Sequence, residues 1–509
     1  MESRTSNSIK NASFGISSYI LTTVISFIAR TIFIQVLGKT YLGISGLFND
    51  ILQLLALSEL GIGTAITYAM YKPIANDDKE KVRAYMLFFK KIYMCIGLFV
   101  FLLGLLITPF LDFFISDIPD IANIKLIFML YVSNTAVSYF FSYKRCLLNA
   151  YQLSRVNTVN LFVFQMAQYI IQSIVLVMYK DFIIYLLIQI MCTLASNCFV
   201  SIKTNKMFPE LTQGKDDRLE KEEKSSLFKN VTALFSLKLS SAVVTSTDNI
   251  LISKYVSTVI LGVYSNYALI TTMVKTLFAK IFEGLTGSIG NYAIDNTGKK
   301  SVQLFYNILF INYWLVSIVC IGMYFLIDDF ISLWIGKEYI LESSIVILIV
   351  INLFTRLLRN TMLVFIDAYG IFKNLKLKSI SEAVANLVIS LFLLKGLDMG
   401  VEGVLLGTFL SNMLVNFWWE PYALIEKTWR QSLWTYFKKI IIYVAVIGIE
   451  VISISLINKN ISIENVLLRL FVKGCIVLIV VNIVNYLCFR KREEYAFLKS
   501  KITTKLGRK

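Results

Sequence analysis

The feature that most constrains the fold is a series of apolar runs, each of 20 or more residues, that recurs along all 509 residues. As a helix, each run is long enough to cross the roughly 30 Å of hydrocarbon in a bilayer. The strands of membrane barrels alternate apolar and polar residues over about ten positions, and these runs do not alternate. Hydrophobic residues make up 57% of the chain and charged residues only 16%, which leaves too little polar surface for a water-soluble protein. The sequence therefore predicts an all-α polytopic membrane protein.

We expect about 14 membrane-spanning helices, in two groups of six and a final pair. The first six cover 9–37, 42–71, 84–108, 121–143, 156–178 and 181–202. The next six cover 229–254, 259–291, 301–327, 339–367, 374–395 and 400–425, and the last pair covers 436–457 and 465–489. An even number of spans places both termini on one side of the membrane.

The net charge of +17 is distributed unevenly between the two sets of predicted loops. The loops on the side of the N-terminus carry 33 Lys and Arg residues, and the opposite loops carry 6. Basic residues accumulate in short cytoplasmic loops, so both termini are predicted to be cytoplasmic. Membrane topology, and not a nucleic-acid partner, explains the positive charge.

Several kinds of chemistry are missing from the sequence. It has no histidine, and its seven cysteines lie in or beside apolar runs without metal-binding spacing. Catalysis by histidine and the commonest metal ligand are thereby excluded. No predicted outer loop exceeds about 15 residues, which disfavours a membrane glycosyltransferase or polymerase, since such enzymes need external loops for their chemistry. We expect neither an enzyme nor a bound cofactor.

Two stretches of the sequence resemble one another. "ARTIFIQVLGKTYLGISGLFNDIL" crosses from the first predicted helix into the second, and "TDNILISKYVSTVILGVYSNYALI" crosses from the seventh into the eighth. In each, a charged residue (Arg30 or Asp248) precedes a glycine (Gly43 or Gly262) by 13 or 14 positions. Six helices separate the copies, so they are parallel repeats, as in two-lobed transporters. The alternative is a chance likeness between two apolar hairpins.

"LGKTYLGISGLFNDILQLLALSELGIGTAITYAMYKPIANDDKEKV", "STDNILISKY", "GSIGNYA", "LWIGKEY" and "GVEGVLLGTFLSN" resemble the signatures of Wzx-type oligosaccharide repeat-unit flippases. These belong to the polysaccharide-transporter branch of the multidrug/oligosaccharidyl-lipid/polysaccharide exporter superfamily. The resemblance implies two six-helix lobes in a V around a central cavity, and alternating access. The implied substrate is an undecaprenyl-pyrophosphate-linked oligosaccharide, carried from the cytoplasmic to the outer leaflet of the bacterial inner membrane. Capsule, O-antigen or exopolysaccharide assembly would follow, with membrane lipid and a polysaccharide polymerase and other assembly proteins as partners.

This organisation gives five segments. They are an N-lobe (1–203), a charged cytoplasmic linker (204–228), a C-lobe (229–430), helices 13 and 14 (431–490) and a basic cytoplasmic tail (491–509).

Cations in the middle of predicted spans are the candidate substrate-binding residues. A charge at a helix centre costs about 2.5–3.5 kcal/mol on insertion scales, so it normally faces a wet cavity or a partner. We expect a cationic lining for the pyrophosphate, because Arg and Lys bind phosphate oxygens. It comprises Arg30, Lys238, Lys275, Arg356 and Arg359.

Acids in the same helices leave a second interpretation open, in which the cations are paired structurally. Asp50, Glu59 and Asp248 are the candidate gating or pairing acids, and Arg30 and Asp50 are expected at similar depth on adjacent helices. Arg356 and Arg359, three positions apart, are predicted to point the same way.

A coupling-cation site is implied by a resemblance to lipid II flippases of the superfamily, for Na⁺ or with H⁺ as the alternative. Asp248, Glu382, Asn386 and Thr408 occupy comparable places, with the order of acid and amide reversed. The alternative role for Asn386 and Thr408 is structural, since Asn and Thr in membrane helices often form hydrogen bonds between helices. At the level of function, a multidrug exporter or a lipid II flippase remains the alternative within the superfamily.

Overall fold

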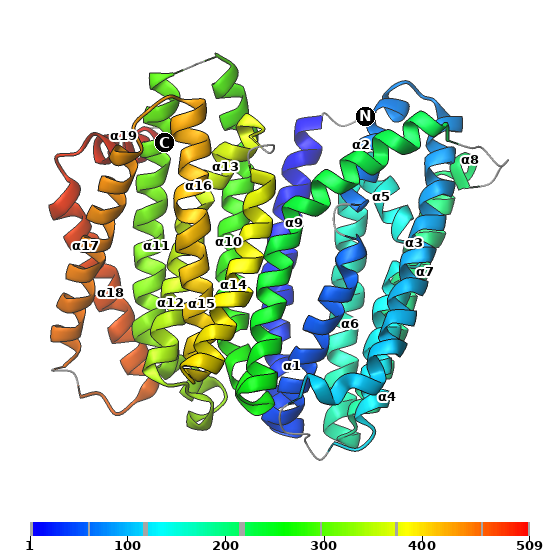
Figure 1. Cartoon of the computed structure of the whole chain (residues 1–509), viewed down its shortest axis with the longest axis horizontal. Coiled ribbons are helices and arrows are strands. Elements are labelled where there is room, and N and C mark those ends of the chain that lie inside the picture. Colours follow the sequence, from blue (N-terminus) through cyan, green and yellow to red (C-terminus); the bar gives the residue numbers. More distant parts are fainter. Residues whose placement is uncertain are drawn as a thin grey trace. The chain divides into compact units, whose positions relative to one another are not determined.

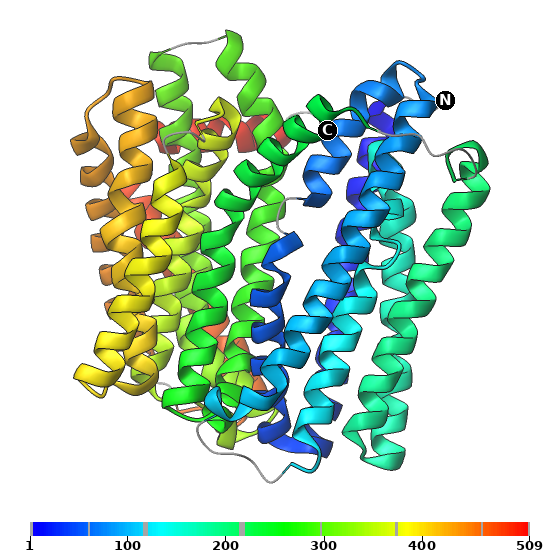
Figure 2. The same ribbon diagram turned by 45° about the vertical axis from the view of Figure 1, so that its right-hand side comes forward.

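The computed structural model describes residues 4–59, 62–115, 121–212, 219–295, 298–371, 375–459 and 462–506. Within these ranges the secondary structure consists of helices and turns, with no strand. The chain forms two compact units, Met1–Gly262 (unit 1) and Val263–Lys509 (unit 2). Within each unit the long helices run side by side along a common direction (Figures 1 and 2).

The described part of unit 1 contains eleven helical elements and the start of a twelfth. They are α1 (Arg4–Leu55), η1 (Ala56–Glu59), α2 (Ile62–Ala75), α3 (Lys79–Ile107), η2 (Thr108–Phe113), α4 (Ile124–Tyr139), α5 (Ser142–Ala150), α6 (Ser154–Tyr179), α7 (Phe182–Met207), α8 (Pro209–Thr212), α9 (Lys221–Tyr255) and the first turn of α10 (Thr258–Asp295). α1 packs against α6 and α9, while α4, α6 and α7 form a neighbouring layer.

Unit 2 contains the rest of α10 and the helices that follow. They are α11 (Lys299–Trp334), η3 (Lys337–Tyr339), α12 (Ser343–Leu358), α13 (Asn360–Tyr369), α14 (Lys376–Gly396), α15 (Gly400–Ser411), the π-helix η5 (Asn412–Asn416), α16 (Phe417–Pro421), the π-helix η6 (Tyr422–Thr428), α17 (Leu433–Asn458), α18 (Val466–Phe489) and α19 (Glu493–Leu506). α14 packs along α15, and α18 packs along α11.

Many helices in the described residues have the length and composition of membrane-spanning segments. Eleven helical stretches in these ranges are long and apolar enough to cross a bilayer. Many large apolar side chains on them are exposed, among them Leu106, Met178, Phe392 and Phe471, as expected of surfaces that face lipid. The predicted class, an all-α polytopic membrane protein, is confirmed. The five predicted segment boundaries stay a prediction, and the division at Gly262 is a separate observation.

Two predicted spans of unit 1 are interrupted where the sequence pattern shows one run. α1 itself breaks at Gly38, at the predicted end of the first span, and the φ of 78° and ψ of −176° there suit a residue without a Cβ. The run 42–71 is divided between the end of α1 and α2, next to the glycines of "ELGIG". The run 121–143 ends at Tyr139, and Phe141, with a φ of 68°, starts the separate helix α5.

The two glycines of the internal repeat lie against one another. A Cβ on Gly43 would overlap the carbonyl oxygen of Thr258, and a Cβ on Gly262 would overlap the carbonyl oxygen of Lys39. α1 and the first turn of α10 therefore approach backbone to backbone, which small residues permit. This contact explains why both copies of the repeat carry glycine at the matching position.

Apolar packing holds each unit together separately. In unit 1, buried side chains of α2, α3 and α5 such as Ile66, Phe89 and Leu147 form one cluster. In unit 2, Ile321 of α11 and Val477 of α18 pack with residues of α17. The last two long helices are thereby fixed to α11.

Candidate functional site: a buried ion-pair network in unit 2

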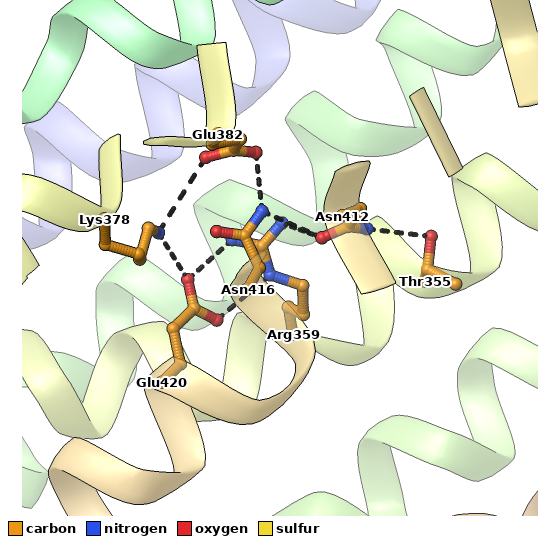
Figure 3. Close-up of polar contacts among 7 residues, drawn as sticks. All are labelled: Thr355, Arg359, Lys378, Glu382, Asn412, Asn416 and Glu420. Carbon is orange, nitrogen blue, oxygen red and sulfur yellow. Dashed lines mark hydrogen bonds and ion pairs between the residues drawn. The ribbon is translucent and has the colours of Figure 1, made fainter. Parts of the chain in front are cut away.

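A network of charged and amide side chains lies among α12, α14 and the irregular helix from η5 to α16, and Figure 3 shows its contacts. Its members are Thr355, Arg359, Lys378, Glu382, Asn412, Asn416 and Glu420.

Glu420 is the centre of the network, and only 1% of this residue is exposed. Arg359 donates to it twice, from Nε to Oε2 at 3.0 Å and from Nη2 to Oε1 at 2.6 Å. Lys378 Nζ donates to the same Oε1 at 2.7 Å. Bidentate guanidinium–carboxylate pairs are the stronger kind of charge-assisted hydrogen bond. Because Glu420 is buried, its carboxylate is stabilised by Arg359 and Lys378 in place of water.

Glu382 supplies the second negative charge. Its Oε1 accepts from Asn416 Nδ2 at 2.5 Å, and its Oε2 lies 4.0 Å from Lys378 Nζ. With Arg359 and Lys378 against Glu382 and Glu420, the network is electrically neutral.

Asn412 connects the charged groups to the neighbouring helix. Its Oδ1 accepts from Arg359 Nη1 at 2.9 Å and from Asn416 Nδ2 at 2.8 Å. Its Nδ2 donates to Thr355 Oγ1 at 3.3 Å. The amides thus fix the guanidinium from the side opposite Glu420.

Local sequence explains how these side chains converge. Asn412, Asn416 and Glu420 are spaced by four, so they follow one face of the helix, as do Lys378 and Glu382 on α14. Asn412 and Asn416 are the two ends of the π-helix η5, and Pro421 ends α16. A π-turn widens the helix locally and is frequent at functional sites.

The structure separates two predicted lining residues, Arg356 and Arg359. α12 ends at Leu358, so Arg359 stands at the junction with α13 and turns into the network. Arg356, one turn earlier, is exposed. The expectation that both side chains point the same way stays a prediction, since the backbone of Arg359 is still helical and its N–H donates to the carbonyl oxygen of Thr355. Arg359 takes the structurally paired alternative.

Arg356 instead lies within electrostatic range of Lys275 of α10. Neither side chain forms an ion pair within the part of the chain that the structure describes. Arg359, Glu420 and Glu382 of the network also act on Arg356 electrostatically. Lys275 and Arg356 are therefore two like charges within electrostatic range, and among the described residues neither is held in an ion pair.

The remaining lining candidates lie in unit 1. Arg30 is partly buried on α1, within electrostatic range of Tyr185 of α7. Lys238 lies on α9, and its side chain falls outside the described ones.

The predicted acids of unit 1 have identifiable surroundings. Asp50 is buried and accepts from Asn249 Nδ2 at 2.8 Å, which links α1 to α9. Asp248, next in sequence to Asn249, is buried on α9. Glu59 in η1 hydrogen-bonds with the hydroxyl of Tyr139.

Three of the four predicted coupling-cation residues lie in unit 2. Asn386 Nδ2 donates to Thr408 Oγ1 at 3.0 Å across α14 and α15, which is the interhelical hydrogen bond expected as the alternative. Glu382, one turn from Asn386, joins the network, and Asp248 belongs to unit 1. No cluster of three or more Cys, Asp or Glu side chains suited to a metal ion occurs in the described ranges.

Sequence reasoning missed Glu420 and Lys378. Glu420 lies in "NFWWEPY", which reads as an interfacial aromatic belt, and Lys378 falls in a stretch counted as cytoplasmic loop. The spacing of Asn412, Asn416 and Glu420 was the available signal.

A family model described as "Polysaccharide biosynthesis protein" matches residues 8–286, more than half of the chain. No curated protein sequence matches at a significant level.

Solved structures resemble the whole fold. "Lipid II flippase MurJ, inward closed conformation" is similar with a TM-score of 0.71 at 14% identity, covering 94% of this chain and 98% of that one. An inward-facing multidrug resistance MATE family transporter of the MOP superfamily has a TM-score of 0.64 at 12% identity, covering 81% and 97%. A MOP superfamily transporter from Pyrococcus furiosus has a TM-score of 0.51 at 13% identity, covering 81% and 93%.

The chain thus shares its fold with these solved membrane transporters. The chain belongs to the polysaccharide biosynthesis protein family. Both statements confirm the resemblance read from the sequence.

Proposed function

We propose that this protein is a flippase that carries undecaprenyl-pyrophosphate-linked oligosaccharide repeat units across the bacterial inner membrane. Transport runs from the cytoplasmic to the outer leaflet by alternating access and serves capsule, O-antigen or exopolysaccharide assembly. Membership of the polysaccharide biosynthesis family and a fold shared with flippases and exporters support the proposal. Both termini are cytoplasmic, and the lobes span 1–203 and 229–430.

The observation that carries the substrate assignment is the pair of like charges Lys275 and Arg356, neither of which forms an ion pair among the described residues. Two like charges within electrostatic range repel one another. A pyrophosphate group would relieve it, since guanidinium and ammonium groups both bind phosphate oxygens. Arg30 and Lys238 extend the proposed lining, while Arg359 acts indirectly by holding the network beside Arg356.

Coupling to Na⁺ or H⁺ through Asp248, Glu382, Asn386 and Thr408 stays part of the proposal. The ammonium of Lys378 stands 4.0 Å from Glu382, where it supplies a tethered positive charge to that carboxylate. A free cation at Glu382 would therefore have to compete with Lys378.

A lipid II flippase is the second candidate function. It is favoured by the likeness to MurJ, which extends over 94% of this chain, against 81% for the MATE transporter. A multidrug exporter is disfavoured by the cationic pair, because cationic drugs would be repelled there.

Deletion of the gene tests the proposal in the host cell. We expect loss of surface polysaccharide and retention of lipid-linked repeat units on the cytoplasmic leaflet. A plasmid copy with Lys275→Ala and Arg356→Ala should fail to restore export, while Lys280→Ala, on the same helix, should restore it. Rescue of a strain depleted of its lipid II flippase would instead favour the second candidate. Normal surface polysaccharide in the deletion strain, with no second flippase, would defeat the proposal.

A further inference from the structure

A second group of buried cations lies in unit 1, where α5 meets α6 and α7. Lys144 and Arg145 are adjacent on α5, and Lys144 is only 6% exposed. The helix break at Phe141 turns α5 toward its neighbours, which brings both side chains among polar groups of α6 and α7. The topology count assigned both residues to a cytoplasmic loop, because the predicted spans ended at 143 and resumed at 156.

Every hydrogen-bond partner of the two cations is an uncharged group. Lys144 Nζ donates to Ser201 Oγ at 2.6 Å and to Asn205 Oδ1 at 2.7 Å. Its ammonium also lies 5.5 Å from the centre of the Phe141 ring. Neutral acceptors orient an ammonium but leave its charge uncompensated.

Arg145 is satisfied on one side only. Its Nη2 donates to Asn160 Oδ1 at 3.1 Å, Ser196 Oγ at 3.0 Å and Asn197 Oδ1 at 3.1 Å. Its Nη1 is buried and has no hydrogen-bond partner. Because a guanidinium carries two donor hydrogens on each Nη, two donors are left without an acceptor in the part of the chain that the structure describes.

No carboxylate balances these charges. Neither Lys144 nor Arg145 forms an ion pair within the described residues. The nearest further charge that acts on Lys144 is another cation, Lys90 of α3. A buried cation without a counter-charge costs several kcal/mol, and neutral hydrogen bonds recover only part of that cost. The Arg359 network shows the contrast, since the same residue types there are neutralised by Glu420 and Glu382.

We propose that Lys144 and Arg145 form a phosphate-binding site, with the oxyanion bound at Arg145 Nη1 and facing Lys144. A phosphate group supplies both the missing negative charge and several acceptor oxygens, and an arginine–lysine pair is suited to it. Unlike the Lys275 and Arg356 pair, the site lies wholly in unit 1. α5 lies near α2, toward the end of unit 1 that carries the N-terminus (Figure 1). If the proposed function holds, that end faces the cytoplasmic leaflet, where a phosphate-bearing lipid would enter.

Thermal unfolding of the full-length protein in phosphate-free detergent tests the site. Sodium pyrophosphate is titrated against sodium chloride of equal ionic strength. Wild type should show a saturable rise in Tm with pyrophosphate only. Arg145→Gln should weaken the apparent affinity about tenfold or more, which corresponds to about 1.4 kcal/mol. Arg469→Gln, which removes an ion-paired cation in unit 2, is the control and should keep the wild-type affinity.

Asn160→Asp keeps the test decisive if Arg145→Gln does not fold. Asn160 Oδ1 already faces Arg145, and the donor lost from its Nδ2 makes only a 3.3 Å bond to Ser196. In a protein that also carries Lys275→Ala and Arg356→Ala, the new carboxylate should raise Tm without ligand and abolish the response to pyrophosphate. A response that matches sodium chloride in wild type, or that survives Asn160→Asp in this background, would overturn the proposal.

Two further arms identify the source of the phosphate and separate this site from the substrate lining. Native mass spectrometry in phosphatidylglycerol and phosphatidylcholine vesicles reports headgroup binding. Retention of phosphatidylglycerol by wild type but not by Arg145→Gln would identify a lipid headgroup as the source of the phosphate. The Lys275→Ala and Arg356→Ala double variant should keep the Arg145-dependent response, so that this site can stand if the proposed function fails.

Discussion

Replacing Glu420 by glutamine removes the carboxylate that neutralises both Arg359 and Lys378 in the interior of unit 2. The side chain keeps its shape, so the change isolates charge. Breaking a buried ion pair by removing one partner typically costs about 3–5 kcal/mol, because the remaining charge is left uncompensated. Glu382 lies 4.0 Å from Lys378 and offsets part of this loss, so we expect about 3 kcal/mol, the lower end of that range.

Glu210→Gln is the matched control. Lys79 Nζ lies 2.6 Å from Glu210 Oε2, about as close as Lys378 to Glu420, but the side chains are 50% and 68% exposed. Solvent and salt screen exposed ion pairs, so this variant should be nearly neutral.

Reversible unfolding in a titration with sodium dodecyl sulfate measures both variants. Adding Lys378→Met to Glu420→Gln should restore part of the lost stability, since one uncompensated cation is removed. Similar small losses for Glu420→Gln and Glu210→Gln, or a further loss in the double variant, would refute the reasoning from burial.

Three further predictions concern other parts of the chain. Glu450 of α17 is fully buried, and neither of its carboxylate oxygens has a hydrogen-bond partner among the described residues. Glu450→Leu should therefore raise the free energy of unfolding by about 1–3 kcal/mol. A lower unfolding midpoint for this variant would contradict the prediction. Gly43→Ala and Gly262→Ala should each lower the free energy of unfolding by about 1–3 kcal/mol and reduce export, because the added Cβ would overlap the backbone of the neighbouring helix. Unchanged unfolding midpoints would show that α1 and α10 move apart without cost. Burial raises the pKa of Glu494, but its contact with Lys439 outweighs this and holds the pKa below the usual value of about 4.3. The contact therefore stabilises the docking of α19 above that pH and is lost as the pH falls through the lowered pKa; hydrogen exchange of α19 should rise on acidification, and Glu494→Gln should remove this dependence.

The helical class and most helix positions could be predicted because spanning a bilayer imposes a length and a composition that one sequence reveals. The break at Gly38 coincides with the predicted end of the first span, whereas the break at Phe141 is less visible, since it interrupts an apolar run. The break at Phe141 matters most, because it converts a supposed loop cation, Arg145, into a partly buried one.

The partners of the buried charges could not be predicted. Arg359 and Glu420 are 61 residues apart, and their pairing depends on how α13, α14 and α16 pack. Arg30 and Asp50 were expected at similar depth in the membrane, which suggested Asp50 as a partner for Arg30. In the structure, Asn249 donates a hydrogen bond to Asp50. Spacing within one helix carries a signal, as for Asn412, Asn416 and Glu420, but contacts between distant helices need the fold.

The internal repeat could be predicted only in part. Its glycines were identified from sequence as matching positions, and the structure shows why they match, since Gly43 and Gly262 meet at one helix crossing. A sequence shows that two positions correspond, but not that they touch.

Reconstitution in proteoliposomes tests the central claim most directly. The measurement is the rate at which an undecaprenyl-pyrophosphate-linked oligosaccharide becomes accessible to a lectin on the far side of the bilayer. The account predicts rapid exposure with the wild-type protein and loss of that exposure with Lys275→Ala and Arg356→Ala. Exposure no faster than in protein-free vesicles, or equally fast with the double variant, would contradict it.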